Sequence, residues 1–181
     1  MTAKLKRGIT KVKDPGSALT HFIAMILAII AAIPLLSKAG HDSGHMHISA
    51  LAIFILSMIG LYAASTIYHT LDISPKINKL LRKIDHMMIF ILIAGTYTPV
   101  CMIVLGDKTG WTMLTLVWGI AIVGILINAL WITCPKWFSS LIYIAMGWVC
   151  ILAITKILSS MPRAGFMWLL AGGIIYTVGG I

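Results

Sequence analysis

Four polar side chains could do chemistry at one end of an otherwise apolar chain: His21, Ser65, His69 and Asp85. Ser65 and His69 are four positions apart, so on a helix they share one face. A neutral imidazole is a common metal ligand, and a nearby carboxylate such as Asp85 can hold the imidazole, hold a metal-bound water or ligate the metal directly. Because polar side chains are costly in a membrane, the group predicts a metal or proton site.

The elements that must position these residues are membrane-spanning helices. The 181 residues are 60% hydrophobic and 10% charged, and their mean hydropathy is +1.00. This composition excludes a water-facing globular protein of ordinary surface charge. We therefore expect an all-α membrane protein, a bundle of helices that each have roughly 20 apolar residues. Six such stretches occur, at Leu19–Leu36, Ile48–Leu71, Met87–Leu105, Trp111–Ile132, Phe138–Leu158 and Ala164–Ile181.

The chain is expected to have two parts. Residues 1–17 form a basic cytoplasmic segment, and residues 18–181 form a single transmembrane helical domain. The connections between the apolar stretches are short and contain no Ser-rich or Gly-rich linker, which favours one compact bundle. The first apolar stretch is too long for the apolar region of a cleavable signal peptide, so we expect it to remain as an anchor.

The charge of the chain indicates its orientation. Fourteen Lys and Arg against five Asp give a formal charge of +9, a balance that in a soluble protein would suggest a nucleic-acid partner. Here the basic residues are divided unequally between the two predicted sides, which is the positive-inside pattern of a cytoplasmic N-terminus. We expect no nucleic-acid partner. The side that holds the N-terminus has Lys4, Lys6, Arg7, Lys11, Lys13, Lys76, Lys79, Arg82, Lys83 and Lys136, and the other has Lys38, Lys108, Lys156 and Arg163.

This topology brings the candidate residues to the cytoplasmic level. His21 begins the first helix, His69 ends the second and Asp85 begins the third. Simpler interpretations stay open: Asp85 could cap a helix N-terminus, and a His at a helix end could titrate freely in the headgroup zone. His21 either caps the inner end of the bundle or supports the site. His86 points about 100° away from Asp85 on a helix, which favours an interfacial position.

A second histidine group lies on the predicted outer side. His41, His45 and His47 include a His-xxx-His spacing that could bind a transition metal. The hydrocarbon core of roughly 30 Å separates them from His69, and Gly44 interrupts the helix that would align them. We therefore expect this segment to be a solvated loop.

Other residues predict packing. Gly60 and Ala64 form a small-xxx-small pair that allows close approach of another helix. Tyr97 lies near a predicted membrane interface, where amphipathic rings are enriched. The same position is expected for three tryptophans, Trp111, Trp131 and Trp137. These residues predict architecture and not chemistry.

Three motifs together resemble a known family. They are Asp14-Pro-Gly-Ser-Ala-Leu-Thr-His21, Ser65-Thr-Ile-Tyr-His69, and Asp85-His86 followed by Leu92-Ile-Ala-Gly-Thr-Tyr-Thr-Pro99. From about Asp14 onwards the chain resembles the bacterial hemolysin III branch of the progestin and adiponectin receptor family. The first motif departs from the family pattern, with Asp14 and Ser17 where the family more often has Glu and Asn. The substitution keeps a carboxylate and a small polar group.

The resemblance implies a seven-helix bundle with a cytoplasmic N-terminus. It also implies a Zn²⁺ site, in which the metal is bound by the histidine that matches His69 and by two histidines of a His-xxx-His motif on helix seven. The aspartate that matches Asp85 would contact the zinc-bound water. Those two histidines are absent from this sequence, which ends in the sixth apolar stretch. We therefore expect a fragment of a longer chain, or else a truncated protein with an incomplete site.

The related ceramidase-like membrane hydrolases suggest a function for the intact protein. Zinc would lower the pKa of its water to near 7, Asp85 would accept a proton from that water, and Ser65 could hydrogen-bond a developing oxyanion. The implied substrates are lipid amides or esters, the implied partners are membrane lipids, and the implied location is the bacterial plasma membrane. Two alternatives stay open: a pore-forming cytolysin, and a non-catalytic sensor or receptor of membrane state.

Overall fold

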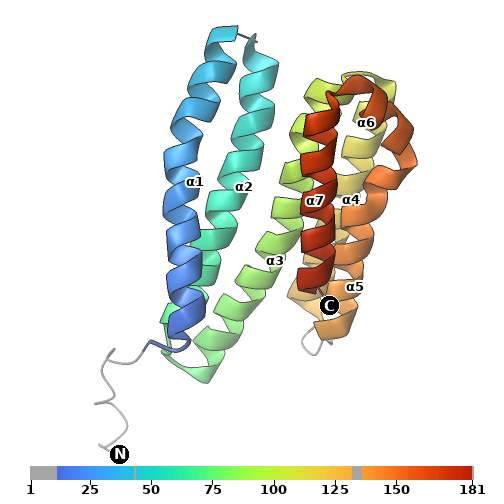
Figure 1. Cartoon of the computed structure of the whole chain (residues 1–181). Helices are drawn as coiled ribbons and strands as arrows, with labels where there is room; N and C mark the ends of the chain where they lie inside the picture. The colour runs from blue at the N-terminus through green and yellow to red at the C-terminus, as the bar shows by residue number, and fades with distance from the viewer. Residues whose placement is uncertain (1–11, 43, 132–135, 181) are drawn as a thin grey trace, which may run out of the picture.

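The computed structural model describes residues 12–42, 44–131 and 136–180, and within these ranges the chain is a helical bundle without strands (Figure 1). The basic segment up to residue 11 lies outside the described residues. The elements are α1 (Pro15–Asp42), α2 (Gly44–Thr70), α3 (Pro75–Pro99), the π-helical segment η1 (Val100–Leu105), α4 (Lys108–Leu130), α5 (Lys136–Gly147), the 3-10 segment η2 (Trp148–Ala153), α6 (Ile154–Ser160) and α7 (Arg163–Gly180).

Five helical stretches are long and apolar enough to cross a membrane, within the part of the chain that the structure describes. The third stretch joins α3 to η1, and the fifth joins α5, η2 and α6. A sixth apolar helix, α7, has 18 residues and covers the last predicted stretch. The five are Pro15–His41, Gly44–Thr70, Pro75–Leu105, Lys108–Leu130 and Trp137–Ser160. The predicted all-α membrane bundle is confirmed.

The third helix begins earlier than predicted. Ser74 caps its N-terminus by accepting a hydrogen bond from the backbone N–H of Ile77 at 3.3 Å, and Pro75 follows in the first turn. Asp85 therefore lies well inside α3 and is 8% exposed, so its interpretation as an N-terminal cap is wrong. The basic residues expected in a loop also lie on α3: Lys76, Lys79, Arg82 and Lys83.

The connection between the first two helices is shorter than predicted. α1 continues to Asp42 and α2 starts at Gly44, so His41, His45 and His47 are helical, and the expectation of a solvated loop is wrong. Gly44 has a φ of +79°, a left-handed conformation that glycine adopts without a steric penalty. Because the turn at Gly44 needs few residues, the two helices extend over the segment predicted as a loop. The side chains of His41 and His45 are nevertheless exposed.

The fifth span is not the continuous α-helix predicted for Phe138–Leu158. It changes from α5 to the 3-10 segment η2 after Gly147. Tyr97 of α3 satisfies backbone groups at this break: its hydroxyl donates to Gly147 O at 2.6 Å and accepts from the N–H of Cys150 at 2.9 Å. Tyr97 is 8% exposed and belongs to the bundle interior, so the prediction of an interfacial ring is wrong.

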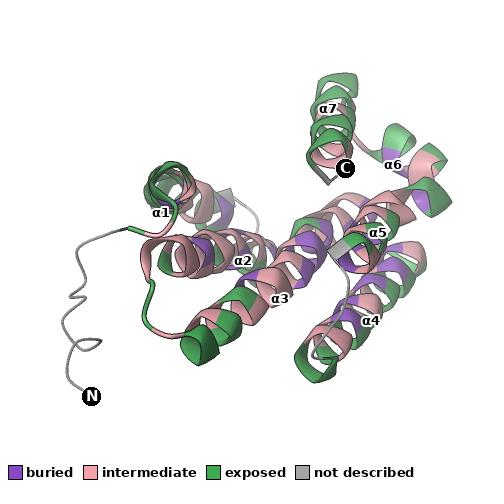
Figure 2. Ribbon diagram, turned by 90° about the horizontal axis from the view of Figure 1, so that it is seen from below, coloured by how far each residue is buried: buried purple, intermediate pink, exposed green. Residues whose placement is uncertain are grey.

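α3 lies in the middle of the bundle. Seen from one end, α1 and α2 lie on one side of α3, and α4 and α5 lie on the other (Figure 2). The main core forms on the α4 and α5 side, where Phe90 packs with Val117 and Met146. Gly124 permits this packing, since a Cβ at that position would lie 2.3 Å from the Phe90 ring.

The α2 side of α3 is held by small residues. A Cβ on Gly95 would lie 2.2 Å from Ser57 Oγ, and a Cβ on Gly60 would lie 2.7 Å from Met88 Cε. At Gly95 the helices approach this closely only because there is no side chain, whereas at Gly60 the end of the flexible Met88 side chain could move aside. Close contact of α2 with α3 sets the spacing of the two helices that carry His69 and Asp85.

Candidate functional site

The start of α1, the end of α2 and the first half of α3 lie at the same end of the bundle (Figure 1), and the predicted site residues lie on these parts of the helices. Asp14 immediately precedes α1, and the other members lie on the three helices. We call this group the His69 cluster. Its members are Asp14, His21, Ser65, His69 and Asp85.

Asp14 holds His69 by two contacts. The Nδ1–H of His69 donates to Asp14 Oδ2 at 3.0 Å, because an ionised carboxylate can only accept. The backbone N–H of Asp14 also donates to the carbonyl of His69 at 2.9 Å. This second bond satisfies a carbonyl at the end of α2, which has no partner inside its own helix. Asp14 thus caps α2 and at the same time orients the imidazole.

His21 lies against the ring of His69. The two ring centroids are 5.7 Å apart and the ring planes differ by only 14°, so the imidazoles are stacked. The ring of Tyr62, on α2, is 5.9 Å from His21 on another side. His21 also lies within electrostatic range of both His69 and Asp85. His21 therefore contacts His69 and lies near Asp85.

Asp85 and Ser65 are the buried members of the cluster. Asp85 forms its only ion pair among the described residues with His86, whose Nδ1 is 3.7 Å from Asp85 Oδ2. Ser65 is 4% exposed and forms no hydrogen bond with another described residue. The neighbouring Thr66 hydroxyl, in contrast, donates to the carbonyl of Tyr62 at 2.7 Å. The Ser65 hydroxyl therefore keeps its donor available for a bound molecule.

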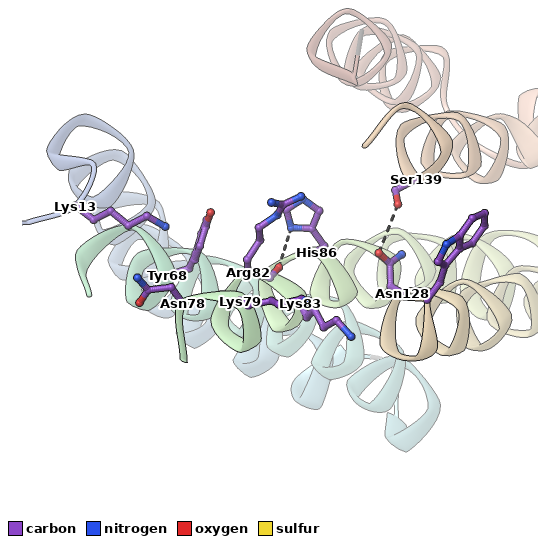
Figure 3. A pocket seen from close by; sticks show the side chains of 10 residues that line it. Lys13, Tyr68, Asn78, Lys79, Arg82, Lys83, His86, Asn128 and Ser139 are labelled. Atoms are coloured by element: carbon purple, nitrogen blue, oxygen red, sulfur yellow. Dashed lines mark hydrogen bonds between the residues drawn. The ribbon is translucent and has the colours of Figure 1, made fainter. Parts of the chain in front are cut away.

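His86 is near Asp85 but also borders a neighbouring surface. Its Nδ1 lies 2.8 Å from the carbonyl of Arg82, and its side chain lines a pocket with basic residues of α3 (Figure 3). The carbonyl of His86 accepts a hydrogen bond from the Tyr143 hydroxyl at 2.9 Å, which ties α3 to α5. His86 thus contributes to a neighbouring surface and to packing.

The His69 cluster contains His and Asp side chains, the residue types that bind zinc. Because Asp14 occupies Nδ1, the Nε2 atom of His69 is the one available to a metal, and a carboxylate on the other ring nitrogen is the usual partner of a zinc-binding histidine. Among the residues that the structure describes, however, no three His, Cys, Asp or Glu side chains come together as a metal site. The described cluster therefore contains side chains of the kinds that bind zinc, but not a complete set of ligands.

The sequence prediction assigned no role to Asp14. Its spacing from His69 along the chain is 55 positions, so no local periodicity relates the two residues. The sequence does contain one indication of a role for Asp14. In the motif from Asp14 to His21, the aspartate lies just before a Pro-Gly pair that begins a helix. A carboxylate at that point can reach only the ends of the neighbouring helices, and the end of α2 carries His69.

Comparison with known proteins identifies a family over nearly the whole chain. Residues 9–181 match a family model described as Haemolysin-III related. The chain is 40% identical to Hemolysin-3 of Bacillus cereus over 182 aligned positions, which cover 100% of this chain and 83% of the relative. It is 37% identical to the Hemolysin-3 homolog of Bacillus subtilis strain 168 over 169 positions, which cover 93% of this chain and 79% of the relative.

Proposed function

The chain belongs to the Haemolysin-III related family, and on that premise we propose that its His69 cluster is the reaction centre of a zinc-dependent hydrolase. The substrates are lipid amides or esters, which reach the cluster from the cytoplasmic side of the plasma membrane. We also propose that the N-terminus is cytoplasmic. The hydrolase assignment applies to the protein with a complete zinc shell, of which the described residues would supply a part.

The observation that supports the proposal most is the Asp14 and His69 pair beside the buried carboxylate of Asp85. A buried carboxylate in an apolar bundle is costly unless it is paired. Asp85 has only imidazoles, those of His21 and His86, as charged neighbours among the described residues. A purely structural carboxylate would be better neutralised by a Lys or Arg, whereas a carboxylate among imidazoles suits metal binding and proton transfer.

The chain's own residues supply the other parts of a hydrolytic mechanism. Zinc, when bound, provides a Lewis acid that brings the pKa of water to near 7. Asp14 holds the His69 ring through Nδ1, so Nε2 would be the atom that holds the metal. Asp85 accepts the proton that the attacking water loses and returns it to the leaving group. Ser65 donates a hydrogen bond to the oxyanion that develops on the scissile carbonyl.

Zinc content is the first experiment. In the purified protein with a complete zinc shell we expect His69→Ala to lower zinc well below one per chain by elemental analysis. The matched control is His45→Ala, on the same helix but at its opposite end and exposed, which should leave zinc unchanged. Equal zinc loss in the two variants would refute the role of His69.

Hydrolysis is the second experiment, and it separates the function classes. In reconstituted protein Asp85→Asn should keep most of the zinc but abolish release of fatty acid from a panel of lipid amides and esters, because an amide cannot accept the proton. The relatives are named for haemolysis, so dye efflux from the same vesicles is measured in parallel. Undiminished hydrolysis in Asp85→Asn would exclude Asp85 as the base. Efflux without hydrolysis, independent of metal, would favour a pore.

A further inference from the structure

A pocket of about 370 Å³ lies beside the His69 cluster, between the start of α3 and the end of α4 (Figure 3). Its wall is strongly basic: Lys79, Arg82 and Lys83 come from α3, and Lys13 comes from the segment before α1. The pocket has no established role in the mechanism proposed above. We call it the basic pocket.

The basic residues of α3 converge by helical spacing. Lys79, Arg82 and Lys83 are at positions i, i+3 and i+4, so they share one face of α3. Like charges at this spacing repel each other and destabilise a helix. A positive-inside bias requires basic residues on this side of the membrane, but it does not require them to meet in one pocket. Their convergence therefore needs an explanation of its own.

Each acidic side chain that the structure describes has a partner other than a Lys or Arg of the pocket. Asp14 binds His69, and Asp85 has only His86 as an ion-pair partner. Asp107 pairs with Lys156 at the opposite end of the bundle. The fourth of these acidic side chains, Asp72, accepts a hydrogen bond from Asn78 at 2.7 Å. None of the four thus forms an ion pair with a Lys or Arg of the basic pocket. Asp72 and Asp85 contact its wall only at Asn78 and His86, so the pocket keeps an excess of positive charge among the described residues.

The hydrogen-bond donors of the pocket are also available. The Lys83 ammonium uses one donor on the carbonyl of Ala129 at 2.7 Å, which leaves two of its three. Lys13 lies over the Tyr68 ring with its nitrogen 3.6 Å from the ring centroid, and this contact uses the charge but no acceptor oxygen. The side chains of Lys79 and Arg82 have no hydrogen bond or ion pair with any described residue. The pocket therefore presents a guanidinium and ammonium groups to one concave space.

We propose that the basic pocket binds a phosphate group, presented by the headgroup of an anionic phospholipid or by free phosphate. A guanidinium fork matches phosphate oxygens bidentately, and ammonium groups add point charges around it. The pocket opens at the ends of membrane-spanning helices, which is the depth of lipid headgroups. Trp131, 47% exposed, lies in its wall as aromatic side chains do at a membrane interface. This inference does not depend on zinc or on hydrolysis.

The experiment measures the thermal unfolding midpoint of the protein in phosphatidylcholine nanodiscs. A ligand of the folded state raises the midpoint as its concentration increases. We expect increasing fractions of phosphatidylglycerol to raise it in the wild type. The double variant Lys79→Gln Arg82→Gln should need about 25-fold more phosphatidylglycerol for the same rise, at about five-fold for each basic residue removed. Both side chains are exposed, and Lys79→Gln alone should show the five-fold step.

A matched control removes two exposed basic residues from the opposite end of the bundle. Lys38→Gln Lys108→Gln has the same net charge as the test variant and should respond like the wild type. Inorganic phosphate, added to nanodiscs of phosphatidylcholine alone, identifies the source: a rise assigns the pocket to free phosphate, and a rise with phosphatidylglycerol only assigns it to a headgroup. Equal weakening in both double variants, or no rise with either ligand, would overturn the proposal.

Discussion

Asp14 and His69 are joined by two hydrogen bonds, one between backbone groups at 2.9 Å and one between the Asp14 carboxylate and the imidazole at 3.0 Å. The backbone bond closes the end of α2 onto the start of α1 and so places the carboxylate where Nδ1 of His69 can reach it. The same residue, Asp14, consequently caps α2 and orients the imidazole of His69. A change in the side chain of Asp14 can remove the orientation while the backbone bond remains.

We therefore predict that Asp14→Ala changes the tautomer of His69. In the wild type the hydrogen bond to Asp14 holds the proton of the neutral ring on Nδ1. The variant should lose this preference, which nitrogen NMR of labelled histidine detects without any metal. Zinc affinity should fall about 10–100-fold, as for other losses of a carboxylate behind a zinc-binding histidine.

Asp72→Ala is the control for this experiment. It removes a carboxylate from the same end of the bundle, but one that accepts from Asn78 and does not contact a histidine among the described residues. The nitrogen spectrum of His69 should stay unchanged. The same spectral change in both variants would show that Asp14 does not orient the ring.

Gly95→Ala should destabilise the bundle by about 1–3 kcal/mol, the usual cost of overpacking. The new Cβ would lie 2.2 Å from Ser57 Oγ and 2.8 Å from Ser57 Cβ, so α2 would have to move away from α3. Unfolding in mixed micelles measures the loss. The double variant Ser57→Gly Gly95→Ala should recover most of it, since the next atom, Ile53 O, is 3.5 Å away.

Gly119→Ala serves as the control for helical glycine replacement. No atom lies within 4 Å of a Cβ at that position on α4, so the substitution should be neutral or stabilise by up to about 1 kcal/mol through helix propensity. If Gly95→Ala behaves in the same way, close packing of α2 on α3 is not the reason for glycine there.

Tyr97→Phe should cost about 1–3 kcal/mol, because at the break between α5 and η2 it leaves the N–H of Cys150 without its bond and the carbonyl of Gly147 with only the weak bond from the Cys150 thiol. Tyr176→Phe is the matched control: the Tyr176 hydroxyl is buried without a partner among the described residues, so its removal should be neutral or stabilising. Micelle unfolding again gives the measurement. Equal effects of the two substitutions would contradict a role for Tyr97 at the break.

The Asp107 carboxylate should make stability depend on acid pH. The hydrogen bond from Lys156, joined by a bond from the Gly110 N–H, holds the pKa of Asp107 below its usual range. A lowered folded pKa means that the stabilisation is complete above the unfolded pKa of about 3.9 and is lost as the pH falls through the lower folded value. Asp107→Asn, which can still cap α4, should abolish this part of the acid dependence in unfolding titrations. An unchanged acid limb would show that the pair adds nothing.

The sequence predicts the existence of the helices well but their ends less well. Long apolar runs identify the spans because the membrane demands them, and the same argument brought His21, His69 and Asp85 to one level. The start of α3 was misplaced because apolarity begins at Met87, whereas the capping signal, Ser74 followed by Pro75, lies a dozen residues earlier. Charged residues in the first turns of a membrane helix look like a loop when only hydropathy is considered.

Contacts between helices were beyond prediction from one sequence. The bonds from Tyr97 to the α5 break and from Asp14 to His69 join residues 50 and 55 positions apart. Nothing in local periodicity relates such residues, because their meeting depends on how helices are rotated and tilted against each other. The basic pocket is a similar case: helical spacing aligns Lys79 with Arg82, but only packing of α3 beside α4 makes a concave site.

The orientation of the bundle gives the last prediction. At the more basic end, Lys13 contacts the ring of Tyr68 and Lys83 donates to the carbonyl of Ala129. At the other end, Lys156 pairs with Asp107. The excess of Lys and Arg at the first end predicts that it faces the cytoplasm.

Reporter fusions after Ile73, in the connection from α2 to α3, should therefore be cytoplasmic, and fusions after Gly106, in the connection from η1 to α4, should be external. Replacing Lys79, Arg82 and Lys83 by Gln should weaken this preference and give a mixed population, whereas replacing Lys38 and Lys108 should not. The reverse orientation in the wild type would place the His69 cluster and the basic pocket on the outer side, where the substrates and the phospholipids of the cytoplasmic leaflet could not reach them.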